Sequence, residues 1–225
     1  MTWNDVTFRQ YLDLTYYYEN IDQYEDELDK IVGLLVVFNN DIDIDSLYTM
    51  KYMEVQRLFE PISRLLNTEM TKQNVKHEPF ENYTYGDWIN MEHFLKEKDW
   101  ENIFMSITKE KDIDLDTILA IHYLPLYEKY MKYRDAIYQN YQNVFKMTKD
   151  DVDPDETPEE AAEREKAEED MNKNSQFTWY LHTYNLAKGD VTKFDEIFEL
   201  NHLFIFNILD MKLRFKLDEV YRGLF

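Results

Sequence analysis

The sequence predicts an all-α fold, an irregular multi-helix bundle with a helical C-terminal subdomain that follows an acidic linker. Only 4 Gly and 5 Pro occur in 225 residues, whereas an all-β fold needs many turn residues. In several segments, apolar residues recur at intervals of three and four, which is the period of an amphipathic helix. The length is sufficient for one large domain or two small ones.

Residues 1–148 are expected to form an N-terminal helical domain. Helices are predicted over 8–18, 22–38, 86–95 and 99–108, between polar or acidic turns. Two longer apolar seams indicate helices that pack against other helices. They are Tyr48, Tyr52, Val55, Phe59, Ile62 and Leu66, and then Leu126, Tyr130, Tyr133, Ile137, Tyr141 and Val144. Pro61 lies within the first seam and predicts a kink or a restarted helix there.

Residues 149–175 are expected to form an acidic linker and a charged helix. Between 150 and 170 the sequence has 12 Asp or Glu residues against Arg164 and Lys166. Thr157 and Pro158 have the pattern of an N-cap followed by proline at the first helical position. A solvated helix or flexible linker explains such a charge block, and a specific docking role is the alternative.

Residues 176–225 are expected to form a C-terminal helical hairpin-like subdomain. A helix over 177–187 should end at Lys188-Gly189, and Thr192 should cap a short helix that reaches Leu200. Asn201 can cap the last helix. Residues 203–209 of that helix are apolar except for Asn207, so this domain or another chain should bury its first half. An apolar stripe with spacings of four, three and four residues runs along the helix. The stripe consists of Phe204, Ile208, Met211 and Phe215.

The charge balance argues against direct contact with nucleic acid or an anionic lipid surface. There are 25 basic and 46 acidic residues, a formal net charge of −21, which repels phosphate groups. No membrane segment is predicted, because the longest apolar run, 31–38, is far shorter than the ~18 residues that a span needs. With no Cys, neither disulfides nor thiolate chemistry are available, and we expect the chain to be made in a cytoplasm.

Two acidic runs resemble the start of a calcium-binding loop and then depart from it. After the alternating carboxylates of 41–45, Ser46 stands where the loop needs Gly and Tyr52 where it needs a bidentate Glu. The run at 112–116 departs in the same way. Both runs are interpreted as acidic helix N-termini, where carboxylates suit the helix dipole.

No other pattern indicates catalysis. A di-iron bundle needs two Glu-x-x-His pairs, and the sequence has one, Glu199 and His202, across a predicted helix junction. Four glycines cannot build a glycine-rich phosphate loop. We therefore predict no catalytic residue, no cofactor-binding residue and no metal site, and a protein that is not an enzyme.

Aromatic residues are the most unusual feature of the composition, with 18 Tyr, 14 Phe and 4 Trp, 16% of the chain. Tyr and Trp can cover half-exposed helix faces, and they are also enriched at protein interfaces, so both interpretations stay open. For the second interpretation, the predicted partner-contact residues are Trp179, Tyr184, Phe204, Ile208 and Phe215.

Two stretches resemble structural proteins of tailed bacteriophages. The first is the Gly-x-Trp-Ile-x-Met-Glu segment of 86–92, followed by Leu-Ala-Ile-x-Tyr-x-Pro at 119–125. The second, 179–197, is similar to the C-terminal helices of phage tail-assembly or virion-associated proteins, especially in AT-rich phages such as the crAss-like group. None of these motif positions is a catalytic residue in that family.

The resemblance implies a non-enzymatic structural or virion-packaged protein that acts through protein–protein contacts at the portal or tail. Its partners would be other phage structural subunits, with a homo-oligomer as an open alternative, and its location would be the virion after synthesis in the host cytoplasm. A transient tail-assembly chaperone, absent from the mature particle, is the alternative. An acidic DNA-mimic inhibitor is a third possibility, against which the concentration of acid at 150–170 counts.

Overall fold

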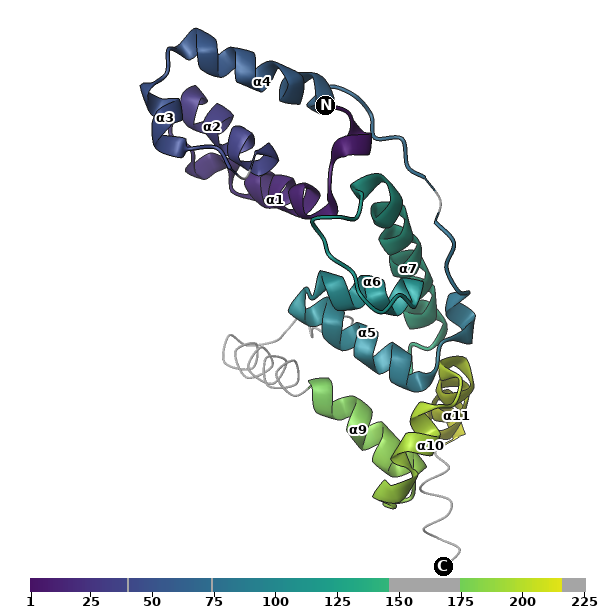
Figure 1. The fold of residues 1–225 in the computed structure, drawn as a ribbon. Helices are drawn as coiled ribbons and strands as arrows, with labels where there is room; N and C mark the ends of the chain where they lie inside the picture. The colour runs from purple at the N-terminus through teal and green to yellow at the C-terminus, as the bar shows by residue number, and fades with distance from the viewer. Residues whose placement is uncertain (40, 74, 146–174, 216–225) are drawn as a thin grey trace, which may run out of the picture. The chain divides into compact units, whose positions relative to one another are not determined.

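The structure, a computed structural model, describes residues 1–39, 41–73, 75–145 and 175–215 (Figure 1). Within these ranges it contains ten α-helices and no β-strand, which confirms the predicted all-α class. The expected charged helix that begins near Pro158 lies outside the described residues. The side chains of 175–178 are likewise not described.

The chain divides into two compact units. Unit 1 consists of Met1–His77 and Trp100–Tyr130, and unit 2 of Glu78–Asp99 and Met131–Phe225. This division differs from the predicted one, in which consecutive segments of the chain, 1–148, 149–175 and 176–225, form the domains. The segment Glu78–Asp99 belongs with the C-terminal helices because its aromatic side chains pack against them.

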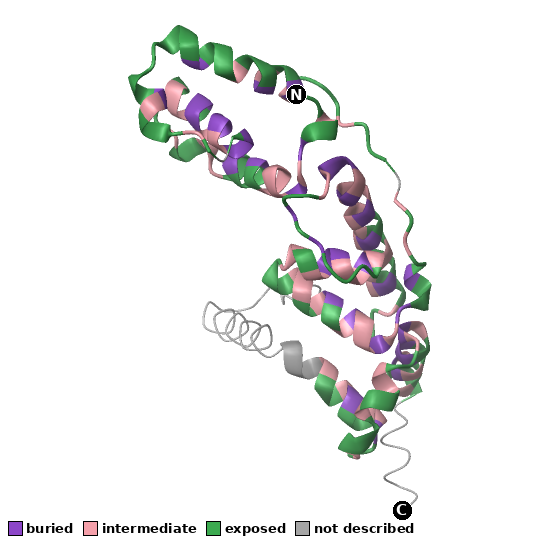
Figure 2. Ribbon diagram, viewed as in Figure 1, coloured by how far each residue is buried: buried purple, intermediate pink, exposed green. Residues whose placement is uncertain are grey.

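Unit 1 is built mainly around helix α2 (Glu27–Phe38), which packs against α1 (Phe8–Glu19) and α4 (Tyr52–Leu66). Unit 1 also holds α3 (Ile44–Thr49), α6 (Trp100–Thr108) and the first half of α7 (Ala120–Asn140). Apolar faces of the helices form its core, and Figure 2 shows the buried residues as purple segments along the helices. Core residues include Leu14, Tyr17, Ile31, Leu35, Val55, Ile62 and Leu65.

The N-termini of α1 and α2 have local caps. The Thr7 side chain accepts a hydrogen bond from the Gln10 amide at 3.2 Å, and the Gln10 side chain accepts one from the Thr7 amide. Helix α2 starts five residues later than predicted, at Glu27, because the Asp26 carboxylate caps it by accepting from the Asp29 amide at 2.8 Å.

The predicted alternative of a restarted helix at Pro61 is wrong, because helix α4 runs through Pro61 and the interruption comes earlier, between the end of α3 and Tyr52. A kink at Pro61, the other alternative, stays a prediction. Pro61 removes one backbone donor, but it lies on the exposed face, where water can satisfy the carbonyl that loses its partner. Tyr48 and Tyr52, at the start of the predicted seam, are exposed rather than packed.

Four residues of the second predicted seam lie on α7, which contains Pro125 in its second turn and ends at Asn140, whereas Tyr141 and Val144 lie beyond that end. Leu126, Tyr130 and Ile137 are all buried. Leu126 and Tyr130 lie in unit 1, and Ile137 lies in unit 2.

Unit 2 is organised around α5 (Tyr85–Glu97), against which α10 (Phe194–Phe198) and α11 (His202–Phe215) both pack. Helix α9 (Ser175–Leu186) packs on α10. The buried core of unit 2 is half aromatic, and most of the partly buried side chains that pack against it are aromatic as well. It consists of Tyr85, Trp88, Ile137, Ile205, Phe206 and Leu209.

Local backbone conformation and side-chain caps set the helix boundaries in 186–204. Helix α9 ends as predicted, with Lys188 and Gly189 at φ of 53° and 83°. Asn201 caps α11 as predicted, its side-chain oxygen accepting from the Leu203 amide at 3.0 Å. The predicted cap at Thr192 is wrong, because the carboxylate of Asp190 accepts from the Thr192 amide at 3.1 Å and starts a 3-10 turn that leads into α10.

Candidate functional site

Three features of unit 2 bear on function: the buried ring of His202, a polar network around Glu92, and a cleft beside α5. The Trp88 ring is fully buried on α5 and stacks on the His202 ring of α11, with centroids 5.5 Å apart and planes at 9°. Phe206, one turn further along α11, meets Trp88 edge to face at 5.3 Å. These contacts hold α5 and α11 together, since aromatic pairs add to the free energy of burial.

His202 is completely buried, and both of its ring nitrogens have partners. Nδ1 lies 2.7 Å from the Tyr83 carbonyl oxygen, and Nε2 lies 2.7 Å from the Tyr133 hydroxyl. A carbonyl only accepts, so Nδ1 donates, and the neutral ring accepts from Tyr133 at Nε2. Burial lowers the pKa of His202 and favours this neutral form. The ring thus cross-links three segments of unit 2, and no lone pair is left for a metal.

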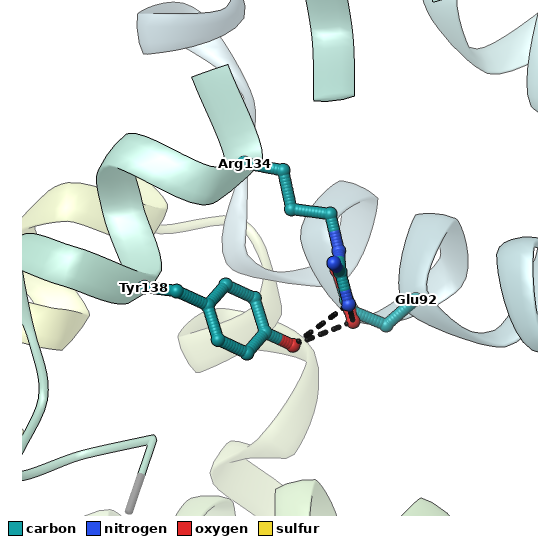
Figure 3. A network of polar contacts seen from close by, with 3 residues as sticks. All are labelled: Glu92, Arg134 and Tyr138. Carbon is teal, nitrogen blue, oxygen red and sulfur yellow. Dashed lines mark hydrogen bonds and ion pairs between the residues drawn. The ribbon is translucent and has the colours of Figure 1, made fainter. Parts of the chain in front are cut away.

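A polar network joins α5 to the second half of α7 (Figure 3). The Arg134 guanidinium donates to both Glu92 carboxylate oxygens, at 2.7 and 2.8 Å. The Tyr138 hydroxyl donates to the same carboxylate at 2.8 Å and accepts from Arg134 at 3.1 Å. The Arg134 and Glu92 side chains are only 24% and 12% exposed, and burial raises the pKa of Tyr138. A carboxylate neutralised in this way positions helices and is poorly suited to proton transfer.

A cleft of about 330 Å³ opens beside the N-terminal half of α5. Nine residues from α5, α9, α10 and their ends line it, and none of them is basic. Its apolar wall includes Ile89, Tyr180 and Phe198, and its carboxylates belong to Asp87, Asp195 and Glu199. Asp87 also caps α5, because its carboxylate accepts from the Thr84 amide at 3.1 Å. The cleft is therefore acidic with aromatic walls, which suits a cation.

The structure places the five predicted contact residues in different environments. Phe204 and Phe215 on α11 are 53% and 66% exposed, and Tyr184 on α9 is exposed as well. Ile208 is half-buried, and Trp179 packs against the core of unit 2.

The first half of α11 is buried on one face only. His202, Ile205, Phe206 and Leu209 form the buried face, whereas Phe204 and Met211 of the predicted stripe are exposed. Of the expected burial by this domain or by another chain, this domain therefore supplies one face, and the other face stays apolar and exposed.

The two acidic runs differ in their outcome. Asp43 caps α3 by accepting from the Asp45 amide at 3.2 Å, so the first run is an acidic helix N-terminus as predicted. In the second run, Asp114 accepts from the Asp116 amide at 2.9 Å within a turn, so its assignment to a helix start is wrong. Among the described residues, no group of three or more His, Asp or Glu side chains could hold a metal ion.

Glu92, Arg134 and the cleft were not predicted from the sequence. The residues of the cleft lie up to 115 positions apart, from Thr84 to Glu199, and no local spacing links them. His202 was noted only beside Glu199, and the structure places these two in different settings, His202 in the core and Glu199 in the cleft.

No helix in the described part of the chain combines the length and apolar character needed to cross a membrane. No protein-family model matches the chain, and neither a curated protein nor a solved structure shows significant similarity to it. The resemblance to phage structural proteins therefore stays a prediction.

Proposed function

We propose that this chain is a non-enzymatic structural or virion-packaged protein of a tailed bacteriophage, which acts by burying apolar helix faces against other proteins at the portal or tail. One observation carries the proposal: α9 and α11 of unit 2 each expose several large apolar side chains. They are Tyr180, Leu181 and Tyr184 on α9, and Phe204, Met211, Leu213 and Phe215 on α11.

These faces carry enough apolar surface to support an interface. Full burial of one Leu, Met or Phe side chain contributes about 1.5–3 kcal/mol. Aromatic anchors in particular dominate binding energies at interfaces. Phe204, Met211 and Phe215 share one face of α11, opposite the face that packs on α5. A partner could cover this face without any change in the core.

The phage assignment depends on the sequence resemblance at 86–92, 119–125 and 179–197. In the structure these segments form the start of α5, the start of α7, and α9 with α10. The net charge of −21 suits such a role, because it keeps an unassembled chain with exposed apolar faces soluble and away from packaged DNA.

The test is quantitative mass spectrometry of purified particles from a phage that encodes this chain. The wild-type chain should be a constant component of the particles. The double substitution Phe204→Asp and Phe215→Asp should lower its copy number by at least about tenfold, because an interface that loses about 1.4 kcal/mol weakens tenfold.

The matched control is Met53→Asp, which changes an equally exposed apolar side chain on α4 of unit 1. It should leave incorporation unchanged. A chain that is produced in infected cells but absent from purified particles would contradict the virion role, and would favour the transient tail-assembly chaperone.

A further inference from the structure

Two of the carboxylates in the cleft beside α5, those of Asp195 and Glu199, lie close to one another. Asp195 and Glu199 are four residues apart on α10 and its C-cap, so their side chains are neighbours, with Cβ atoms about 5–6 Å apart. Like charges at this spacing destabilise a helix. In the described part of the chain, neither carboxylate has an ion-pair partner, and both residues are exposed. A cation placed between them would remove this repulsion.

The walls of the cleft suit a cation with an apolar stem. Tyr180 is 51% exposed, and its ring meets the Phe198 ring edge to face at 6.3 Å. A guanidinium can lie against such a ring and gain a cation–π interaction, while its methylene stem packs on apolar side chains such as Ile89. Gly86 lets α10 pack closely on α5 at this end of the cleft, because a Cβ there would lie only 3.3 Å from both Cβ and the carbonyl oxygen of Phe198.

The size of the cleft limits the occupant. Its volume of about 330 Å³ is at the lower end of the roughly 300–1,000 Å³ typical of ligand pockets, and it fits one long side chain. Tyr180 belongs both to the cleft and to the exposed apolar face of α9. An occupant anchored in the cleft would therefore continue over Leu181 and Tyr184.

We propose that this cleft binds an arginine side chain of a partner protein, with Asp195 and Glu199 holding the guanidinium and Tyr180 stacking on it. Arginine fits better than lysine, because its planar fork can bridge two carboxylates and stack on an aromatic ring. The inference rests on the proposed function, since it names the chemistry of one contact that such a protein would make.

The experiment is a titration of the full chain, labelled with ¹³C at isoleucine methyl groups, with a short peptide in which one arginine is followed by two leucines. The Ile89 methyl signal should shift and saturate, while that of Ile31 in the core of unit 1 should stay in place. A peptide with citrulline instead of arginine has the same shape without the charge, and should not bind. A lysine peptide should bind more weakly.

Two double variants, each of which replaces two carboxylates with uncharged amides, distinguish the effect of the cleft on peptide binding from the effect of the general negative charge. Asp195→Asn with Glu199→Gln should weaken binding of the arginine peptide about tenfold, as expected from the loss of two partly exposed ion pairs. Asp22→Asn with Glu54→Gln removes the same charge from exposed positions in unit 1, and should change the affinity little.

Equal weakening by both double variants, or equal binding of the citrulline peptide, would overturn the proposal. This result is distinguishable from a failure of the proposed function, which is measured by particle content and by the Phe204 and Phe215 substitutions. If the chain enters particles but does not bind the peptide, only the proposed arginine site is overturned. If the chain binds the peptide but is absent from particles, only the proposed virion role is overturned.

Discussion

His202 shows how burial determines the charge of a single side chain. Its pKa is lowered from the ordinary 6.5, mainly by burial, although the nearby charges of Asp87 and Glu81 act in the opposite direction. Below about pH 6.5 the unfolded chain takes up a proton that the folded chain excludes. The contribution of His202 to stability is therefore fully present above that pH and declines as the pH falls.

We expect the urea midpoint of unfolding to decrease between pH 7.5 and pH 5.5. His202→Gln keeps a donor and an acceptor but cannot titrate, so its midpoint should depend less on pH. Some dependence should remain, because burial also lowers the pKa of His182. An identical pH dependence of variant and wild type would show that His202 does not couple folding to pH.

Arg134 and Glu92 illustrate the cost of breaking a largely buried ion pair. Arg134→Met should lower the free energy of unfolding by about 3 kcal/mol, because the Glu92 carboxylate then keeps its buried charge without a counterion, while the neutral Tyr138 hydroxyl still donates to it. Adding Glu92→Gln removes that charge and still leaves an acceptor for Tyr138, so the double variant should recover most of the loss. Urea denaturation measures all three chains. A double variant as unstable as Arg134→Met alone would contradict this account.

At the scale of elements, side chains from neighbouring segments decide what a helix position tolerates. Gly33 lies in the middle of α2, where Ala normally stabilises a helix by about 1 kcal/mol. A Cβ at Gly33 would lie 2.9 Å from Cε2 of Tyr17 and 3.0 Å from Cε1 of Tyr24. Tyr17 is buried, and its hydroxyl donates to the Lys30 carbonyl at 3.1 Å, so the ring cannot move without losing a contact.

Gly33→Ala should therefore destabilise the protein by about 1 kcal/mol, since overpacking costs about 1–3 kcal/mol and exceeds the gain in helix propensity. The control is the same substitution in a chain that carries Tyr17→Leu and Tyr24→Leu. In that chain Gly33→Ala should stabilise the protein, because the two tyrosine rings are absent. Thermal unfolding followed by circular dichroism measures both. Stabilisation in the wild-type background would mean that the rings shift freely.

At the scale of the whole molecule, the net charge of −21 opposes folding through self-repulsion. Raising NaCl from about 20 to 200 mM shortens the Debye length to below about 10 Å and should raise the melting temperature. Sucrose at equal osmolality controls for effects that do not depend on charge. A melting temperature that falls with salt would show that attractive pairs such as Glu92 with Arg134 outweigh the repulsion.

The sequence by itself determined the features that depend on neighbours a few residues away. The scarcity of Gly and Pro and the spacing of apolar residues predicted an all-α chain. Asn201 predicted the start of α11, and Lys188-Gly189 the end of α9. Such signals can be read locally because helix hydrogen bonds and caps join residues no more than about four positions apart.

Only the tertiary structure decided which segments pack together and which apolar faces they cover. Helix α5 joins α10 and α11 across more than 90 residues of sequence, so Trp88 meets His202 and the cleft assembles from α5, α9 and α10. Phe204 and Phe206 look equivalent in an apolar run, yet Phe206 is buried and Phe204 is exposed. Their difference comes from the side of α11 that α5 covers, and burial by a distant segment has no local signal in the sequence.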